Sequence, residues 1–248
     1  MISTVNLFNF KIAKTSYSAL VQYFHAIKDS RFFHVVTLNP EMIVFSEETP
    51  ELKSWIVEAD LRVPDGVGLV WALRLLKKTI VTQITGIGLT QRLLKSGKFS
   101  FYLVGSTPFI IKKAVDQISV NYPNAVIKGY HHGYFTKEQE TTILTEVVDG
   151  EPDIILVGMG FPRQEVFLRL VRQRVSKGIG MGVGGVFDVL SGETRRAPLI
   201  FRKIGLEWAF RGLSDRRRFS RLRFIPKYLS ICLGRTRKRR TYATSTNS

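Results

Sequence analysis

Apolar runs and amphipathic stretches alternate along most of this chain, and this alternation restricts the fold more than any other feature of the sequence. The apolar runs have the length of strands, several are apolar on both faces, and they occupy residues 32–38, 99–105, 124–130, 152–160 and 178–183. Segments with helical spacing lie between them, at residues 108–122, 137–148 and 162–175. Strands joined by helices pair in parallel through right-handed crossovers. The pattern therefore predicts an α/β, Rossmann-like fold, a mainly parallel sheet with helices on both faces.

The positive charge of the chain is concentrated near its carboxyl end. The formal net charge is +17, and residues 195–240 contain 16 Lys/Arg but only two acidic residues. We therefore predict a catalytic α/β domain over residues 1–196 and a basic helical appendage over residues 197–248, with a disordered end. Such a tail can neutralise phosphates of nucleic acid or of anionic lipids, or it can form a solvated basic face.

The composition gives no sign of export or of a membrane span. No run of about 18 apolar residues exists, and residues 1–15 lack the charged start, apolar centre and cleavage site of a signal peptide. Cys232 is the single cysteine, which excludes an internal disulfide and a cysteine metal cluster. We therefore expect a cytoplasmic protein.

Three turns after predicted strands carry glycines in positions that suit phosphate binding. Gly105 precedes Thr107 as a helix cap, Gly160 ends the apolar run at 152–160 just before Pro162, and Gly184 and Gly185 follow the run at 178–183. Ligands bind at the carboxyl edge of parallel sheets, where the N–H groups at a helix start can meet an anion. Glycine also serves ordinary strand-to-helix turns, so each turn alone is weak evidence. Together they predict a nucleotide-sized ligand, and the absence of GxxxxGK[ST] disfavours a P-loop enzyme.

Polar side chains follow two strands in the first half of the predicted sheet. Thr37 and Asn39 come at the end of the apolar run at 32–38, and Asp65 follows a shorter run beside a glycine. All three can face one cleft, where a carboxylate can act as a general base. The alternative is a helix cap or a turn residue bonded to backbone, and spacing alone favours that role for Asp65.

Longer motifs resemble one known family. They are TLNPE, Asp65–Gly66, GYF ending at Phe135, GxPxQE ending at Glu165, GVGGxFDxxSGxxxRAP and GLEW. In this order, over nearly the whole chain, they resemble the WecG/TagA/CpsF glycosyltransferases. Those enzymes move N-acetylmannosamine or a related sugar from a UDP donor to a polyprenyl-diphosphate-linked sugar, in the synthesis of bacterial surface polysaccharides or of the teichoic acid linkage unit.

The resemblance implies a role for each polar residue. Asp65 would take the proton of the acceptor hydroxyl as that hydroxyl attacks the anomeric carbon, with inversion. Thr37 and Asn39 would bind sugar or acceptor hydroxyls, and Gln164 would assist in the same cleft. The glycine turns would receive the UDP-sugar. Because the chain has no Asp-x-Asp motif, we expect neither a metal nor another cofactor, with helix N-termini and arginines supplying the positive potential.

The resemblance also gives the tail a role. Arg211, Arg218 and Arg221 stand where the family has arginines, and the family's appendage is thought to reach over the active site at the membrane, so they are expected to contact the donor diphosphate. Apolar residues beyond them form a helical stripe interrupted by Pro226, suited to the inner face of the cell membrane or to packing on the domain's own core. A homo-oligomer is left open. Nucleic acid is disfavoured as a partner because the tail has no recognition motif.

Two positions depart from the family pattern. The segment TQITGIGL has Gln83 and Gly88 where the family motif RxTGxDL has an arginine and an aspartate. If either missing charge contacts donor or acceptor, the substrate differs, or the chain is a non-catalytic UDP-sugar-binding homologue. Asp188 is expected to stabilise its turn, while Arg195 and Arg196 either bind phosphate or brace that turn.

Overall fold

The structure is a computed structural model that describes residues 2–194 and 223–245. Its strands are β1 Ser3–Leu7, β2 Phe10–Lys14, β3 Phe32–Leu38, β4 Leu61–Pro64, β5 Ser100–Gly105, β6 Val126–His131, β7 Ile154–Gly158 and β8 Gly178–Gly182. They form one sheet in the order β1-β2-β4-β3-β8-β7-β5-β6. Every neighbouring pair is parallel except β1 and β2, so the predicted α/β fold is confirmed.

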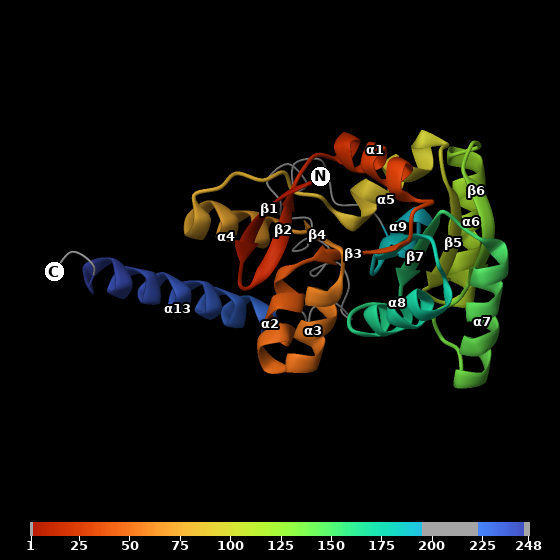
Figure 1. Ribbon diagram of the computed structural model, residues 1–248. Coiled ribbons are helices and arrows are strands. Elements are labelled where there is room, and N and C mark those ends of the chain that lie inside the picture. The colour runs from red at the N-terminus through yellow and green to blue at the C-terminus, as the bar shows by residue number, and fades with distance from the viewer. Residues whose placement is uncertain (1, 195–222, 246–248) are drawn as a thin grey trace.

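Helices cover both faces of this sheet (Figure 1). The helices of the described residues are α1 Tyr17–Ile27, α2 Pro40–Glu48, α3 Pro50–Glu58, α4 Val67–Lys77, α5 Gly86–Ser96, α6 Pro108–Asn121, α7 Lys137–Gly150, α8 Arg163–Arg174, α9 Val186–Leu190 and α13 Phe224–Ser245. One face carries α1, α5, α6 and α9, whose apolar residues share one core cluster with the strands. The other face carries α7 and α8 at one end of the sheet, and α2, α3, α4 and the start of α13 at the other.

The strands predicted from the sequence lie within two residues of those observed. All residues of β3, β7 and β8 are buried, as expected for central parallel strands covered by helices on both sides. In β8 the glycines let neighbours press against the sheet, since a Cβ on Gly180 would lie 2.5 Å from the Phe32 ring. The predicted cap is also confirmed, because the Thr107 side chain accepts the Ile110 N–H at the start of α6.

A hairpin of β1 and β2 extends the sheet antiparallel at one edge, and the sequence analysis did not anticipate it. Leu7 pairs with Phe10, and the two residues between them, Phe8 and Asn9, have φ of 53° and 68°. Positive φ at both central positions is the geometry of a two-residue turn whose twist matches the strands. Phe8 is only 4% exposed, so its burial offsets the backbone strain of that turn.

Helix α13 packs on the body of the molecule. The side chains of Phe224 and Tyr228 are buried in the cluster that contains α2 and α4, and the Tyr228 hydroxyl donates to the Gly68 carbonyl at 3.0 Å. Burial raises the pKa of the Tyr228 hydroxyl above its ordinary value, which keeps it a donor. An interruption at Pro226 was expected, but α13 runs through this residue. Pro226 lies in the first turn of the helix, where a backbone N–H would have no helical acceptor, so its missing N–H costs no hydrogen bond.

The division into residues 1–196 and 197–248 stays a prediction, since residues 195–222 lie outside the described part. Within that part, no helix combines the length and the apolarity needed to cross a bilayer.

Candidate active site

The first group of predicted residues lies at the carboxyl ends of β3 and β4. These strands are neighbours, so Thr37 near the end of β3 and Asp65 just after β4 come to one edge. The Asp65 N–H donates to the carbonyl of Leu38 at 2.8 Å, which holds the two chain segments together where they leave the sheet. The prediction that these residues meet at one edge is therefore realised in the fold.

The carboxylate of Asp65 is fixed by the start of α5. Its Oδ2 accepts the N–H of Gly86, the first residue of that helix, at 3.1 Å. A Cβ on Gly86 would lie 3.7 Å both from Asp65 Oδ2 and from Thr37 Cγ2, so the glycine sits between the two side chains. Asp65 is half-buried, and the helix N-terminus favours its negative charge.

Thr37 and Asn39 each make one structural hydrogen bond. The Thr37 hydroxyl donates to the Gly182 carbonyl of β8 at 2.8 Å, and Asn39 Oδ1 accepts the Met42 N–H at 3.0 Å as the N-cap of α2. A threonine oxygen that donates still has acceptor lone pairs, and an asparagine whose oxygen caps a helix keeps amide hydrogens as donors. Both residues therefore combine a positioning bond with chemistry suited to a sugar hydroxyl.

Gln164 belongs to a chain of buried polar groups that the sequence analysis missed. Its Oε1 accepts the Gly184 N–H at 3.0 Å, and its Nε2 donates to Glu165 Oε1 at 3.1 Å. Glu165 Oε2 lies 2.8 Å from His34 Nε2, and Glu165 and His34 are 0% and 2% exposed. The chain thus runs from the middle of β3 to the glycine-rich turn after β8. A histidine inside the apolar run FFHVVTL is the one sequence signal from which a buried polar partner could have been predicted.

The glycine turns differ in what their glycines do. Gly184 has φ of +55°, and nothing lies within 4 Å of a Cβ built on it, so the turn borders open space. Its N–H donates to Gln164 Oε1 at 3.0 Å, and the approach of this turn to the UDP-sugar stays a prediction. The N–H of Gly185, which precedes α9, stays a predicted contact.

The other two glycines fit local geometry. Gly105 packs on the neighbouring strand β7, where a Cβ built on it would lie 2.5 Å from the Gly158 carbonyl oxygen. Gly160 has φ of +77° in the loop before α8. Nearby, the Ser106 hydroxyl donates to Asp188 Oδ1 at 2.9 Å, and the Asp188 carbonyl accepts the Thr194 N–H at 2.9 Å, contacts that suit the turn-stabilising role expected for this aspartate.

At position 88 the structure supplies a physical reason for the departure from the family pattern. A Cβ on Gly88 would lie 2.5 Å from the Tyr17 hydroxyl oxygen. That hydroxyl accepts the Thr85 N–H at 2.9 Å and contacts Thr85 Oγ1 at 3.2 Å. In this chain Tyr17 of α1 therefore occupies the space beside α5 that a side chain at position 88 would need, and it anchors the helix start that holds Asp65.

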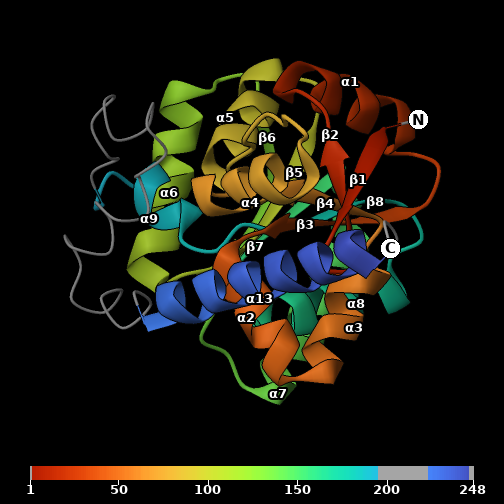
Figure 2. The same ribbon diagram turned by 90° about the vertical axis from the view of Figure 1, so that its left-hand side faces the viewer.

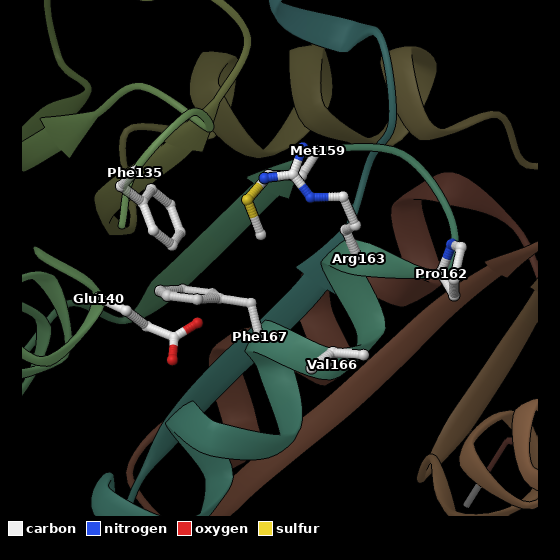
Figure 3. Close-up of a pocket in the computed structure, with 7 residues that line it drawn as sticks. All are labelled: Phe135, Glu140, Met159, Pro162, Arg163, Val166 and Phe167. Carbon is white, nitrogen blue, oxygen red and sulfur yellow. The ribbon is translucent and has the colours of Figure 1, made fainter. Parts of the chain in front are cut away.

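A hollow of about 160 Å³ lies near the β7–α8 turn (Figure 3). It is lined by Phe135, Glu140, Met159, Pro162, Arg163, Val166 and Phe167. None of the predicted site residues lines it, and it is smaller than the roughly 300–1,000 Å³ of typical ligand pockets. The hydrogen bonds around Asp65 and Gly184, rather than this hollow, define the candidate site.

Comparison with known proteins decides the family. A model of the glycosyl transferase WecG/TagA/CpsF family matches residues 5–242. The chain belongs to this family. It is 34% identical over 212 residues to the N-acetylglucosaminyldiphosphoundecaprenol N-acetyl-beta-D-mannosaminyltransferase of Staphylococcus aureus (strain MW2). The aligned region covers 84% of this chain and 83% of that protein. The protein of the same name from Bacillus spizizenii (strain ATCC 23059 / NRRL B-14472 / W23) is 31% identical over 202 residues, 80% of this chain and 78% of its own length.

Membership of the WecG/TagA/CpsF family confirms the resemblance read from the motifs and identifies the chain as a glycosyltransferase. The family match runs through the tail. The predicted diphosphate contacts Arg211, Arg218 and Arg221, and the pair Arg195 and Arg196, lie outside the described residues. Their roles therefore stay predictions, as do those of the residues at the sheet edge.

Proposed function

We propose that this chain transfers N-acetylmannosamine or a related sugar from a UDP donor to a polyprenyl-diphosphate-linked sugar, with inversion. The observation that carries the proposal is the meeting of Asp65, Thr37 and the Gly184 turn at the carboxyl edge of one parallel sheet. Ligands bind at this edge in open α/β folds. The names of the Staphylococcus and Bacillus relatives indicate the sugar and the lipid-linked acceptor.

In this mechanism Asp65 acts as the base. Its carboxylate removes the proton of the acceptor hydroxyl while the hydroxyl oxygen forms a bond to the anomeric carbon. The bond between that carbon and the UDP oxygen breaks at the same time, and UDP leaves with the electron pair. Gly86 holds the carboxylate through Oδ2, which orients the base toward the edge where the sugar would sit.

UDP release tests this proposal directly. The purified chain is given UDP-N-acetylmannosamine, or a panel of other UDP-sugars, with a short-chain lipid-diphosphate-N-acetylglucosamine. We expect acceptor-dependent UDP release from the first donor, and we expect it to survive excess EDTA because the chain has no Asp-x-Asp motif. UDP binding without release from any donor would favour the non-catalytic alternative. Loss on EDTA with rescue by Mg²⁺ or Mn²⁺ would contradict metal independence.

The leaving diphosphate requires positive charge, which we assign to the tail. Arg211, Arg218 and Arg221 are proposed to contact it, because arginine binds phosphate in bidentate fashion. The basic residues near the end of the chain are proposed to bind anionic lipid at the inner face of the cell membrane. The packing of α13 on α2 and α4 supports this, since it anchors the tail to the body beside the start of α4.

Substitutions in two parts of the tail separate these two roles. Replacing Arg211, Arg218 or Arg221 by Gln should lower turnover by about tenfold or more even with a soluble acceptor, the scale of a lost charged hydrogen bond. Replacing Arg237, Lys238, Arg239 and Arg240 together should weaken vesicle binding in a salt-sensitive way while leaving that turnover unchanged. Equal effects of both sets on soluble turnover would contradict the division.

A further inference from the structure

Helix α4 carries an apolar and basic stripe on its outer side. Trp71 and Leu75 are 61% and 78% exposed, and Arg74 and Lys78 beside them are exposed too. The spacing of three and four residues places Trp71, Arg74 and Leu75 on one helix face, and Lys78 caps the carboxyl end of the helix in a left-handed conformation. Ile80, 79% exposed, follows just beyond the helix. We call these five residues the α4 face.

The α4 face is not needed for the core. The opposite side of the helix already buries Leu69, Ala72 and Leu73 against the sheet end. Scattered apolar residues are normal on a protein surface, but three large ones within ten residues, interleaved with cations, are a local concentration of the kind that marks an interaction site.

The charge around the α4 face identifies an anionic partner. No Asp or Glu occurs from residue 66 to residue 115, while Arg74, Lys77 and Lys78 all lie at the end of α4. The charged residues of the α4 face are therefore all cations. A layer that combines phosphates with a hydrocarbon interior matches both the cations and the apolar side chains.

Helix α13 extends this surface. It contacts α4 through the bond from Tyr228 to the Gly68 carbonyl, and its Leu229 and Leu233 are 53% and 65% exposed. Figure 2 shows α4 and α13 together at the front of one side of the molecule, and Figure 1 shows both at the same end. Two helices that carry exposed apolar side chains therefore lie at one side of the molecule.

We propose that the α4 face docks on the anionic surface of a lipid bilayer, with Trp71, Leu75 and Ile80 in the headgroup layer and Arg74 and Lys78 on lipid phosphates. Tryptophan and cations at this depth are typical of interfacial helices. Asp65 and Gly66 directly precede α4, so a role of this docking in catalysis rests on the proposed function, in which Asp65 is the base. Docking would bring that end of the site to the surface in which the lipid-linked acceptor lies.

Vesicle partition of the full chain tests the proposal. Phosphatidylcholine vesicles with and without phosphatidylglycerol are compared for the parent, for Trp71→Ser/Leu75→Ser and for Arg74→Gln/Lys78→Gln. We expect at least tenfold weaker partition for the apolar pair, and a loss for the basic pair that appears only with phosphatidylglycerol and fades at high salt. Phe109→Ser is the matched control, since Phe109 is 66% exposed at the start of α6.

Other outcomes would overturn the proposal. Parent-like partition of both variants would exclude α4 from docking. A fall in particle mass by light scattering for Trp71→Ser/Leu75→Ser, with partition unchanged, would assign the face to a second copy of the chain. Turnover of both variants with a short-chain soluble acceptor should match the parent. If neither the parent nor the variants turn over but the partition results hold, the docking inference survives and the proposed function fails.

Discussion

Asp65→Asn should lower turnover by about 10²-fold or more, the contribution that general acid–base catalysis typically makes. The amide oxygen of asparagine can still accept the Gly86 N–H that Asp65 Oδ2 accepts at 3.1 Å, so the side chain keeps its place and loses only its basicity. Binding of UDP-N-acetylmannosamine, measured by calorimetry, should change by less than about threefold, since the reaction loses a base and the donor loses no contact.

The same chemical change elsewhere supplies the control. Asp149 is exposed on α7, and Asp149→Asn should turn over like the parent. If Asp65→Asn retained full turnover, Asp65 would not be the base. If it lost donor binding and turnover equally, its role would lie in positioning the donor instead.

Glu165→Ala should have the largest effect on stability. It removes a fully buried carboxylate that bonds His34 at 2.8 Å and Gln164 at 3.1 Å. Removing one partner of a buried pair leaves the other without compensation and costs about 3–5 kcal/mol in the free energy of unfolding. For a chain of this size the melting temperature should fall on the order of 10 °C. Thermal and denaturant unfolding measure it.

A double-mutant cycle separates the interaction between His34 and Glu165 from the cost of the cavity that a smaller side chain leaves. His34→Leu/Glu165→Leu should be less destabilised than the sum of the two single variants, because neither polar group is then left alone. Glu51→Ala, an exposed residue at the start of α3, should cost less than about 1 kcal/mol. Additive single effects would show that the pair contributes nothing as a pair.

The sequence predicted the parallel sheet well because its central strands are apolar on both faces. Runs such as residues 32–38 cannot be amphipathic helices, and helical spacing between them leaves few topologies. The β1–β2 hairpin escaped prediction because its turn is built from Phe8 and Asn9 instead of the usual Asn-Gly or Asp-Gly. Local turn chemistry gave no signal there, and the burial of Phe8 decided the conformation.

The site was predictable in its location and less so in its supporting contacts. Thr37, Asp65 and Gln164 follow or adjoin strand ends, and parallel strands bring such ends together. The chain from His34 through Glu165 to Gly184 joins residues separated by up to 150 positions, and no local pattern encodes a pairing of that range. The place of Tyr17 beside Gly88 likewise depends on how α1 packs on α5.

The position of β8 has a consequence for how the chain is made. It lies between β3 and β7 and is, among the strands of the described residues, the last to be synthesised. Until residues 178–182 leave the ribosome, β3 and β7 have no neighbour on their facing edges, and neither half of the sheet is complete. Nascent chains that stop short of this strand would expose two apolar strand edges, so the sheet cannot be completed during synthesis until β8 has been made.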